Sequence, residues 1–239
     1  METKALRQIS TLLSEATQFT NLEEDDRARL ATYTRELDLQ RGEKLFHRGD
    51  PCTGIHIVIS GQLKLAVISN AGKEKIVELV GPGQMIGADS IFSTRFHSVF
   101  AEALSDCHLL HISQSGIENE LKGVSKVGQG LLCALAERSQ HFVEEVEAYS
   151  LNTGKERVIS FFLNELHGVS PDRDEAVLHL SAHKGVIASL LNLTQEHFSR
   201  ILHELQANEL IKVDCRFIGI PSICNLRAEL TCSARSERI

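Results

Sequence analysis

The feature that most constrains this chain is the stretch TQEHFSRILHEL at residues 194–205. Its apolar residues recur at helical spacing, which predicts an α-helix with one buried face. The opposite face carries four polar residues, here named the reading face: Glu196, Ser199, Arg200 and His203. Arginine can donate two hydrogen bonds to guanine, glutamate can accept from cytosine, and serine is permissive. The stretch therefore predicts a helix that reads base edges in the major groove of DNA, with an ordinary solvated surface helix as the alternative.

The residues just before this stretch favour the DNA-binding interpretation. Residues 183–191 form a second amphipathic segment, in which the small Ala188 would let two helices cross closely. Asn192 stands where a tight turn needs a left-handed residue, and Asn tolerates that conformation better than most residues. Thr194 is a suitable N-cap for the second helix. Helix, short turn and helix with a polar face make up the helix-turn-helix pattern.

A hairpin is predicted to follow the two helices, because residues 210–220 alternate in polarity around a short polar break. The net charge of −7 does not favour nucleic-acid binding, and residues 155–239 hold 10 Lys and Arg against 11 Asp and Glu. Affinity for DNA must therefore come from the local placement of cations such as Lys184, Arg200, Lys212 and Arg216. The residues predicted to contact DNA are Thr194, Gln195, Glu196, Ser199, Arg200, His203 and Lys184.

The N-terminal half has a different pattern. Between residues 37 and 112, short apolar segments alternate with glycine-rich turns, which predicts an antiparallel sandwich or barrel. The predicted strands are 44–47, 54–60, 63–68, 75–80, 98–104 and 107–112. Residues 1–36 are predicted to be helical, with the spacing of a capping box from Thr20 to Glu23.

Residues 125–153 form a single long helical pattern without proline. A heptad seam runs along it, and it predicts a coiled-coil dimer interface, with packing on the helix's own domain as the alternative. The residues of this dimer seam are Leu132, Leu135, Ser139, Phe142, Val146 and Tyr149. The predicted domains are 1–120, a sensor with N-terminal helices; 121–153, a dimerisation helix and hinge; and 154–239, a DNA-binding domain.

Composition excludes several other classes of protein. No apolar run approaches the roughly 18 residues of a membrane helix, and the N-terminus lacks the apolar core of a secretory signal. The six cysteines are scattered without a Cys-x-x-Cys pair, which argues against a zinc ribbon or disulfide scaffold and predicts a cytoplasmic protein. The sequence contains no Gly-x-Ser-x-Gly, phosphate-binding loop or His-Glu-x-x-His motif, so we expect no enzyme activity.

The order of these parts resembles the CRP/FNR superfamily of bacterial transcription regulators. The similar text in the N-terminal half includes RGEKLF at 41–46, SGQLK at 60–64 and GQMIG at 83–87, while EHFSR at 196–200 is similar to the FNR-type Glu-x-x-Ser-Arg. The resemblance implies an α+β protein with an antiparallel β-roll, a dimerisation helix and a C-terminal winged helix-turn-helix. It also implies a homodimer that binds a palindrome of the TTGAT-N4-ATCAA type and contacts RNA polymerase.

The chain departs from the family's cyclic-nucleotide pattern. Cyclic AMP-binding members carry a Glu after the glycine of one turn and an Arg-Ser pair for the phosphate, whereas this chain has Ala88-Asp89 and His97-Ser98. Losing the bidentate arginine removes the natural phosphate partner, so cyclic AMP binding is not expected. An N-terminal iron–sulfur cluster is not expected either, because residues 1–36 contain no Cys.

Several signals for the roll remain open. In its overall sequence pattern the chain is most similar to the Dnr and HcpR-like branches, which include haem-linked nitric oxide sensors. This resemblance implies haem b as a candidate cofactor, with His97 as the preferred axial ligand. The histidines considered are His47, His56, His97, His108, His111 and His141. A thiol switch at Cys215, in the predicted wing turn, is one alternative, and a small organic ligand is another. A cyclic-nucleotide module regulating another protein would leave the winged helix unexplained.

Overall fold

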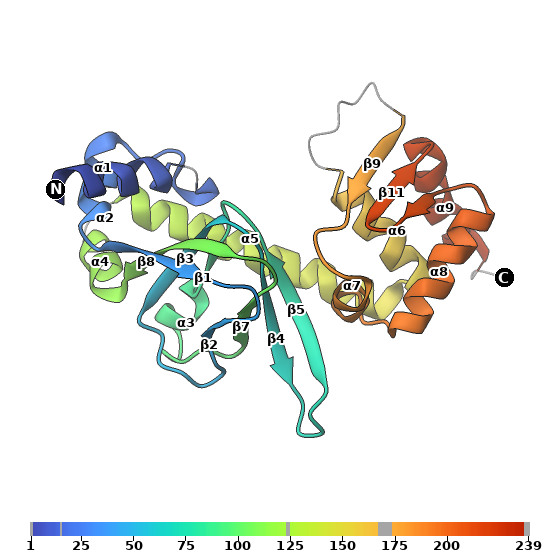
Figure 1. The fold of residues 1–239 in the computed structure, drawn as a ribbon, viewed down its shortest axis with the longest axis horizontal. Helices are drawn as coiled ribbons and strands as arrows, with labels where there is room; N and C mark the ends of the chain where they lie inside the picture. Colours follow the sequence, from blue (N-terminus) through green and yellow to red (C-terminus); the bar gives the residue numbers. More distant parts are fainter. Residues whose placement is uncertain (1, 15, 123–124, 167–173, 237–239) are drawn as a thin grey trace. The chain divides into compact units, whose positions relative to one another are not determined.

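The structure, a computed structural model, describes residues 2–14, 16–122, 125–166 and 174–236. The chain divides into two compact units, Met1–Phe142 and Val143–Ile239, and each is described by itself (Figure 1). The α+β fold predicted from the sequence is confirmed, with antiparallel sheets first, a long helix next and a winged helix-turn-helix last. No helix in the described ranges is both long and apolar enough to cross a membrane.

The first unit contains two four-stranded antiparallel sheets, which form the roll. One sheet has the order β1-β8-β3-β6 and the other the order β2-β7-β4-β5, so β1 and β2 are each edge strands. The strands are β1 (Thr34–Leu39), β2 (Lys44–Phe46), β3 (Gly54–Ser60), β4 (Leu63–Ile68), β5 (Glu74–Val80), β6 (Met85–Ile86), β7 (Phe100–Ala103) and β8 (Cys107–Ser113). Two of them, β3 and β4, have the bounds that the sequence predicts.

Helices of the first unit lie before, within and after the roll. They are α1 (Glu2–Leu13), the 3-10 turn η1 (Thr17–Phe19), α2 (Glu24–Ala31), α3 (Ala88–Phe92), α4 (Gln114–Glu120) and the start of α5 (Lys126–Leu151). The predicted capping box is wrong: Glu23 is the N-cap of α2 without a side-chain hydrogen bond, and the Thr20 hydroxyl donates instead to the Thr17 carbonyl of the preceding turn. The helical prediction also fails from Thr34, because β1 pairs there with β8.

The apolar core of the roll encloses three buried histidines, here named the histidine cluster: His56, His97 and His111. The His56 and His111 rings lie 4.7 Å apart, and His97 stacks on Phe46 with ring centroids 3.5 Å apart. Burial lowers the pKa of each of the three imidazoles, and lowers that of His56 to about 3. All three are therefore neutral near pH 7 in the folded protein.

The second unit contains the end of α5 and the winged helix-turn-helix. Its other elements are α6 (Gly154–Asn164), β9 (Ala176–His179), α7 (Lys184–Leu190), α8 (Gln195–Ala207), β10 (Lys212–Asp214), β11 (Phe217–Ile220) and α9 (Ile223–Ser236). The predicted hairpin is present as β10 and β11, and β9 adds a third antiparallel strand that the sequence analysis missed. Thr153, within the predicted hinge, caps α6 with a complete capping box to Glu156.

The histidine cluster makes the stability of the first unit dependent on pH. The unfolded chain protonates His56 near the ordinary pKa of 6.5, whereas the folded chain does so only near 3. Between these values the unfolded state binds more protons, so lowering the pH favours unfolding. We expect His56 alone to remove up to about 1.4 kcal/mol of unfolding free energy per pH unit between pH 6.5 and pH 3, with the slope developing as the pH falls below 6.5. Urea denaturation of the wild type and His56→Gln at pH 7.5, 6.5 and 5.5 measures this.

The His56→Gln protein is expected to lose less stability than the wild type between pH 6.5 and 5.5, because glutamine does not titrate. The comparison uses the slope with pH rather than the absolute stability, so a general destabilisation by the substitution does not affect the result. Equal slopes for the two proteins would contradict the assignment of a desolvated His56.

Candidate nucleic-acid interface

The turn between α7 and α8 is built by the residues that the sequence singles out. Asn192 has a φ of 55°, in the left-handed region, and so reverses the chain after α7. Thr194 is the N-cap of α8, and its hydroxyl accepts a hydrogen bond from the His197 amide over 3.2 Å. Ala188 on α7 is buried, and α7 contacts α8. The predicted helix-turn-helix is therefore confirmed in its local geometry.

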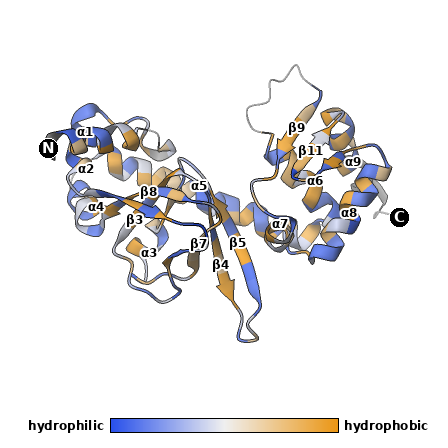
Figure 2. Cartoon of the chain, viewed as in Figure 1, coloured by the Kyte–Doolittle hydropathy of each residue, from blue (hydrophilic) through white to orange (hydrophobic). Residues whose placement is uncertain are grey.

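One face of α8 is buried in the interior of the second unit. Its buried residues are Phe198, Ile201, Leu202 and Leu205. Figure 2 shows hydrophobic and hydrophilic residues side by side along this helix. Because the apolar side chains are removed from water, the opposite face must point outward.

The reading face is exposed along most of its length. Glu196, Arg200 and His203 are exposed, and Ser199 is half-buried. Neither Glu196 nor Arg200 has a hydrogen-bond or ion-pair partner among the described residues. A free carboxylate and a free guanidinium, one helical turn apart, are available to an external partner.

Two further predicted contact residues lie at the start of the two helices. Gln195 opens α8, is exposed, and lies beside Gly185, where an added Cβ would come within 3.1 Å of the Gln195 Oε1. Lys184 opens α7 and is half-buried. The structure thus brings the predicted DNA-contacting residues to two adjoining helix starts and to the outer face of α8.

The wing is held to the helix-turn-helix by a cation at its turn. Cys215 has a φ of 51°, so a non-glycine residue occupies a left-handed turn position between β10 and β11. Next to it, the Arg216 guanidinium lies 3.1 Å from Nε2 of His183, the N-cap residue of α7. Arg216 therefore links the wing turn to α7. Lys212, at the start of β10, is exposed.

Lys155 joins three helices of the second unit through ion pairs, a role that was not predicted from the sequence. Its ammonium lies 2.9 Å from Glu204 on α8 and 2.5 Å from Glu229 on α9. The three residues are separated by 49 and 25 positions in the chain, so no local pattern could have paired them. The ion pairs fix α6 against α8 and α9.

The predicted dimer seam divides into two groups. Leu132, Ser139, Phe142 and Val146 are exposed, with Leu132 at 68% and Val146 at 64%. Leu135 instead packs against the core of the first unit, and the Tyr149 hydroxyl donates to the Leu190 carbonyl over 2.7 Å. Two exposed residues of α5, Val143 and Leu151, are apolar and were missed by the prediction. Four of the six predicted seam residues are thus exposed, and Val143 and Leu151 add exposed apolar side chains to α5.

The predicted effector residues do not form a single open site. Ala88 is buried in the core with Ile55 and Ile91, whereas Asp89 and Ser98 are exposed. His97 is buried against Phe46. Desolvation lowers the pKa of His97, and the nearby Asp89 charge opposes this shift. The structure thus places His97 near Asp89 but points its ring into the roll.

An ion pair that was not predicted from the sequence joins α5 to β5. The Arg138 guanidinium on α5 lies 2.7 Å from the Glu78 carboxylate on β5. Burial raises the pKa of Glu78, and the Arg138 and His141 charges oppose that shift. The pair ties the long helix to the roll within the first unit.

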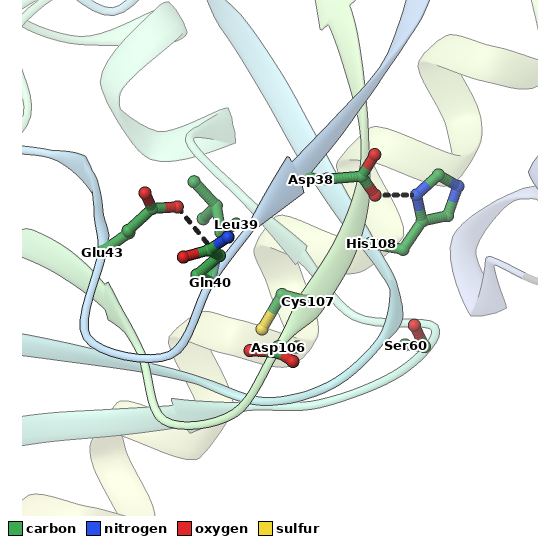
Figure 3. A pocket seen from close by; sticks show the side chains of 8 residues that line it. All are labelled: Asp38, Leu39, Gln40, Glu43, Ser60, Asp106, Cys107 and His108. Carbon is green, nitrogen blue, oxygen red and sulfur yellow. Dashed lines mark hydrogen bonds and ion pairs between the residues drawn. The ribbon is translucent and has the colours of Figure 1, made fainter.

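A large cavity on the roll, of about 520 Å³, has an acidic lining that already serves the fold (Figure 3). The carboxylate of Glu43 accepts from the backbone N–H of Gln40, and that of Asp106 accepts from the backbone N–H of Arg41. Asp38 lies 2.7 Å from Nδ1 of His108. No group of three or more metal-binding side chains occurs among the described residues. These carboxylates stabilise turns and strand ends.

Comparisons with known proteins agree with this geometry. Residues 36–123 match the family model of the cyclic nucleotide-binding domain, and residues 156–229 match that of the Crp-like helix-turn-helix domain. The electron transport regulator A of Shewanella oneidensis is 29% identical over 188 residues, which cover 78% of this chain and 74% of that protein. The fumarate and nitrate reduction regulatory protein of Vibrio cholerae is 26% identical over 191 residues, which cover 78% and 74%.

A solved structure has a similar fold over most of the chain. FixK2 from Bradyrhizobium japonicum superposes with a TM-score of 0.73 at 20% identity, covering 82% of this chain and 96% of that one. The two family models occur in the same order as the roll and the winged helix-turn-helix described above. The chain belongs to the CRP/FNR superfamily and is a DNA-binding transcription regulator.

Proposed function

We propose that this regulator binds, as a homodimer, a palindrome of the TTGAT-N4-ATCAA type. The observation that carries the proposal is the reading face, where Glu196 and Arg200 are exposed and have no partner in the described ranges, while the other side of α8 is buried. A guanidinium and a carboxylate at this spacing match guanine and cytosine edges in the major groove. The half-sites of a palindrome mirror the two-fold symmetry of a protein dimer.

Within this proposal each residue has a distinct role. Arg200 donates to guanine O6 and N7, Glu196 accepts from cytosine N4, and Ser199 makes a permissive contact. Gln195 and His203 extend the contact along the groove at the two ends of the reading face. Lys184 and Thr194, at the helix starts, contact phosphates and fix the register without reading sequence.

The exposed apolar strip of α5 supports the dimer. Leu132, Phe142, Val143 and Val146 expose large apolar side chains on one side of the helix, within about 100° around its axis. A row of this kind on one helix is typical of an interface that a second copy covers. Leu135 and Tyr149 are left out of the proposed interface, since they pack on their own chain.

The signal is proposed to act through the roll. A ligand bound there would change the relation between the two α5 helices of the dimer, and so the spacing of the two α8 helices, and contact with RNA polymerase would follow. The names of the relatives are anaerobic regulatory protein, fumarate and nitrate reduction regulatory protein, and electron transport regulator A. We therefore propose target genes of anaerobic or nitrosative metabolism.

Two kinds of signal compete for the roll, a haem that responds to nitric oxide and a small organic ligand. His97 is neutral, as an iron ligand must be, but its ring stacks on Phe46 and is buried among side chains of the roll. Haem binding through His97 would require this stack to open. The organic ligand is therefore the better supported form. A saturable Soret band shifted by nitric oxide and lost in His97→Ala would reverse this preference.

Replacing Arg200 with alanine should abolish specific DNA binding without affecting the fold. Arg200 is exposed and has no partner in the described part of the chain, so its loss removes only contacts to DNA. We expect each lost bidentate contact to cost about 1–3 kcal/mol, and a dimer loses two. Fluorescence anisotropy with a labelled TTGAT-N4-ATCAA duplex, with a scrambled duplex as competitor, measures the loss.

Arg227→Ala is the matched control. It removes the same charge from an exposed position on α9, in the same unit. We expect this variant to bind the palindrome with nearly the wild-type affinity. If Arg200→Ala and Arg227→Ala weaken binding equally, bulk charge explains the effect and the assigned role of the reading face is wrong.

Replacing Val146 with glutamate should separate the dimer. Val146 is 64% exposed in a single chain, so a charge there is tolerated by the monomer but is costly once the partner helix covers it. We expect the dimer dissociation constant to rise by about tenfold or more, which sedimentation velocity measures. Glu147→Gln, which changes one charge at the next position of α5, should leave the association unchanged. Dimerisation unaffected by Val146→Glu would place the interface elsewhere.

A further inference from the structure

We propose that the opening between the edge strands β1 and β2 of the roll binds a small organic carboxylate with an aromatic body. A cavity of about 460 Å³ lies there, within the size range of small-molecule sites. The residues of its lining that carry the argument are Arg35, Leu37, Phe46, Thr53, His56 and His97. It shares His97 with the predicted effector residues, whereas Ala88 and Asp89 of that set lie on α3 and outside this lining.

The first reason is a buried polar atom without a partner. His56 is only 6% exposed, it lines the cavity, and its Nδ1 has no hydrogen bond among the described residues. An unpartnered polar atom in a protein interior is costly, and such atoms are rare in native proteins. Because burial keeps His56 neutral, its ring can exchange a hydrogen bond with a ligand group without carrying charge.

The second reason is the distribution of charge around the cavity. Two carboxylates line it, and each lies beside a histidine: Asp38 is 2.7 Å from His108, and Asp50 is 3.5 Å from His47. Arg35 is exposed at the opening and has neither a hydrogen bond nor an ion pair among the described residues. Its positive charge is close enough to oppose protonation of His56. Among the charged residues of the lining, Arg35 is the one cation, and its guanidinium, unpaired among the described residues, can bind a ligand carboxylate directly.

The third reason is the shape and polarity of the walls. The apolar side chains of the lining are Leu37, Leu39, Leu45, Phe46 and Pro51. Phe46 and His97 stack with an angle of only 6° between their planes, and so form a flat unit on one side. A planar apolar body suits such walls. A carboxylate suits a guanidinium, with which it forms two parallel hydrogen bonds.

This inference deepens the proposed function, since it rests on the roll being the sensor and names the class of its ligand. Binding is measured on the full chain without DNA, so its outcome does not depend on the palindrome. Failure of the ligand experiment would leave the DNA-binding result standing, and failure of the Arg200 experiment would leave the ligand result standing.

The test is isothermal titration calorimetry of the purified protein with a panel of probes. The probes are benzoate, 4-hydroxybenzoate, phenol and inorganic phosphate. We expect a carboxylate probe to bind saturably with a dissociation constant below about 1 mM, and phenol and phosphate to bind more weakly. Binding of phosphate alone, or of none of the probes, would overturn the proposal.

Two variants locate the site. Arg35→Gln is expected to weaken carboxylate binding by about tenfold or more, whereas Arg48→Gln, at an exposed arginine outside the lining, should bind like the wild type. His56→Phe keeps an aromatic ring and removes the nitrogen, so it should abolish any advantage of 4-hydroxybenzoate over benzoate. Since Arg35 is exposed, its variant should fold even if the His56 variant does not. Equal binding by wild type and Arg35→Gln would exclude this opening as the site.

Discussion

The orientation of α8 depends on the burial of its apolar face, and the chemistry of the second unit depends on that orientation. Phe198, Ile201, Leu202 and Leu205 leave water together, and burying each such side chain contributes on the order of 1.5–3 kcal/mol. A rotation of the helix about its axis would expose these residues and bury Glu196 or Arg200 without partners. The hydrophobic effect, which does not itself recognise DNA, thus orients the face of α8 that is proposed to read the DNA sequence.

The polar contacts around α8 refine this arrangement rather than create it. Thr194 satisfies an amide at the start of the helix, and Lys155 holds two carboxylates from α8 and α9. Arg216 links the wing to α7. These contacts hold α8 and its neighbouring elements together, and the reading face lies on the helix that they surround. Such support is what a site needs if small displacements are to change its affinity.

Sequence reasoning succeeded where structure is set by neighbours in the chain. The period of α8, the left-handed Asn192 and the cap at Thr194 are all decided within a few residues, and they were predicted. It failed where pairing is distant. The strand β1 at Thr34–Leu39 exists because β8 pairs with it, and β9 exists because β11 does. An amphipathic pattern alone could not distinguish a strand from a continuing helix there.

The cavity of the roll shows the same limit for a candidate site. His56 is visible in the sequence as one of 11 histidines, but its burial follows from the closing of two sheets around it. Arg35 lay within residues predicted to be helical, so nothing in the sequence placed it beside a histidine 21 positions later. Nδ1 of His56 and the guanidinium of Arg35, which have no partner among the described residues, can be proposed as a ligand-binding pair only once the edge strands are known.

The left-handed turn at Asn192 has a consequence for how this protein can diverge. The turn restricts position 192 to the few residues that accept a positive φ, whereas Glu196 and Arg200 are exposed and have no hydrogen-bond or ion-pair partner among the residues that the structure describes. Selection for folding therefore acts on the turn and the buried face, and hardly at all on the exposed positions. A duplicated copy of the gene could acquire a new operator through a few substitutions on one helical surface, with its thermal stability and its response to signal inherited unchanged.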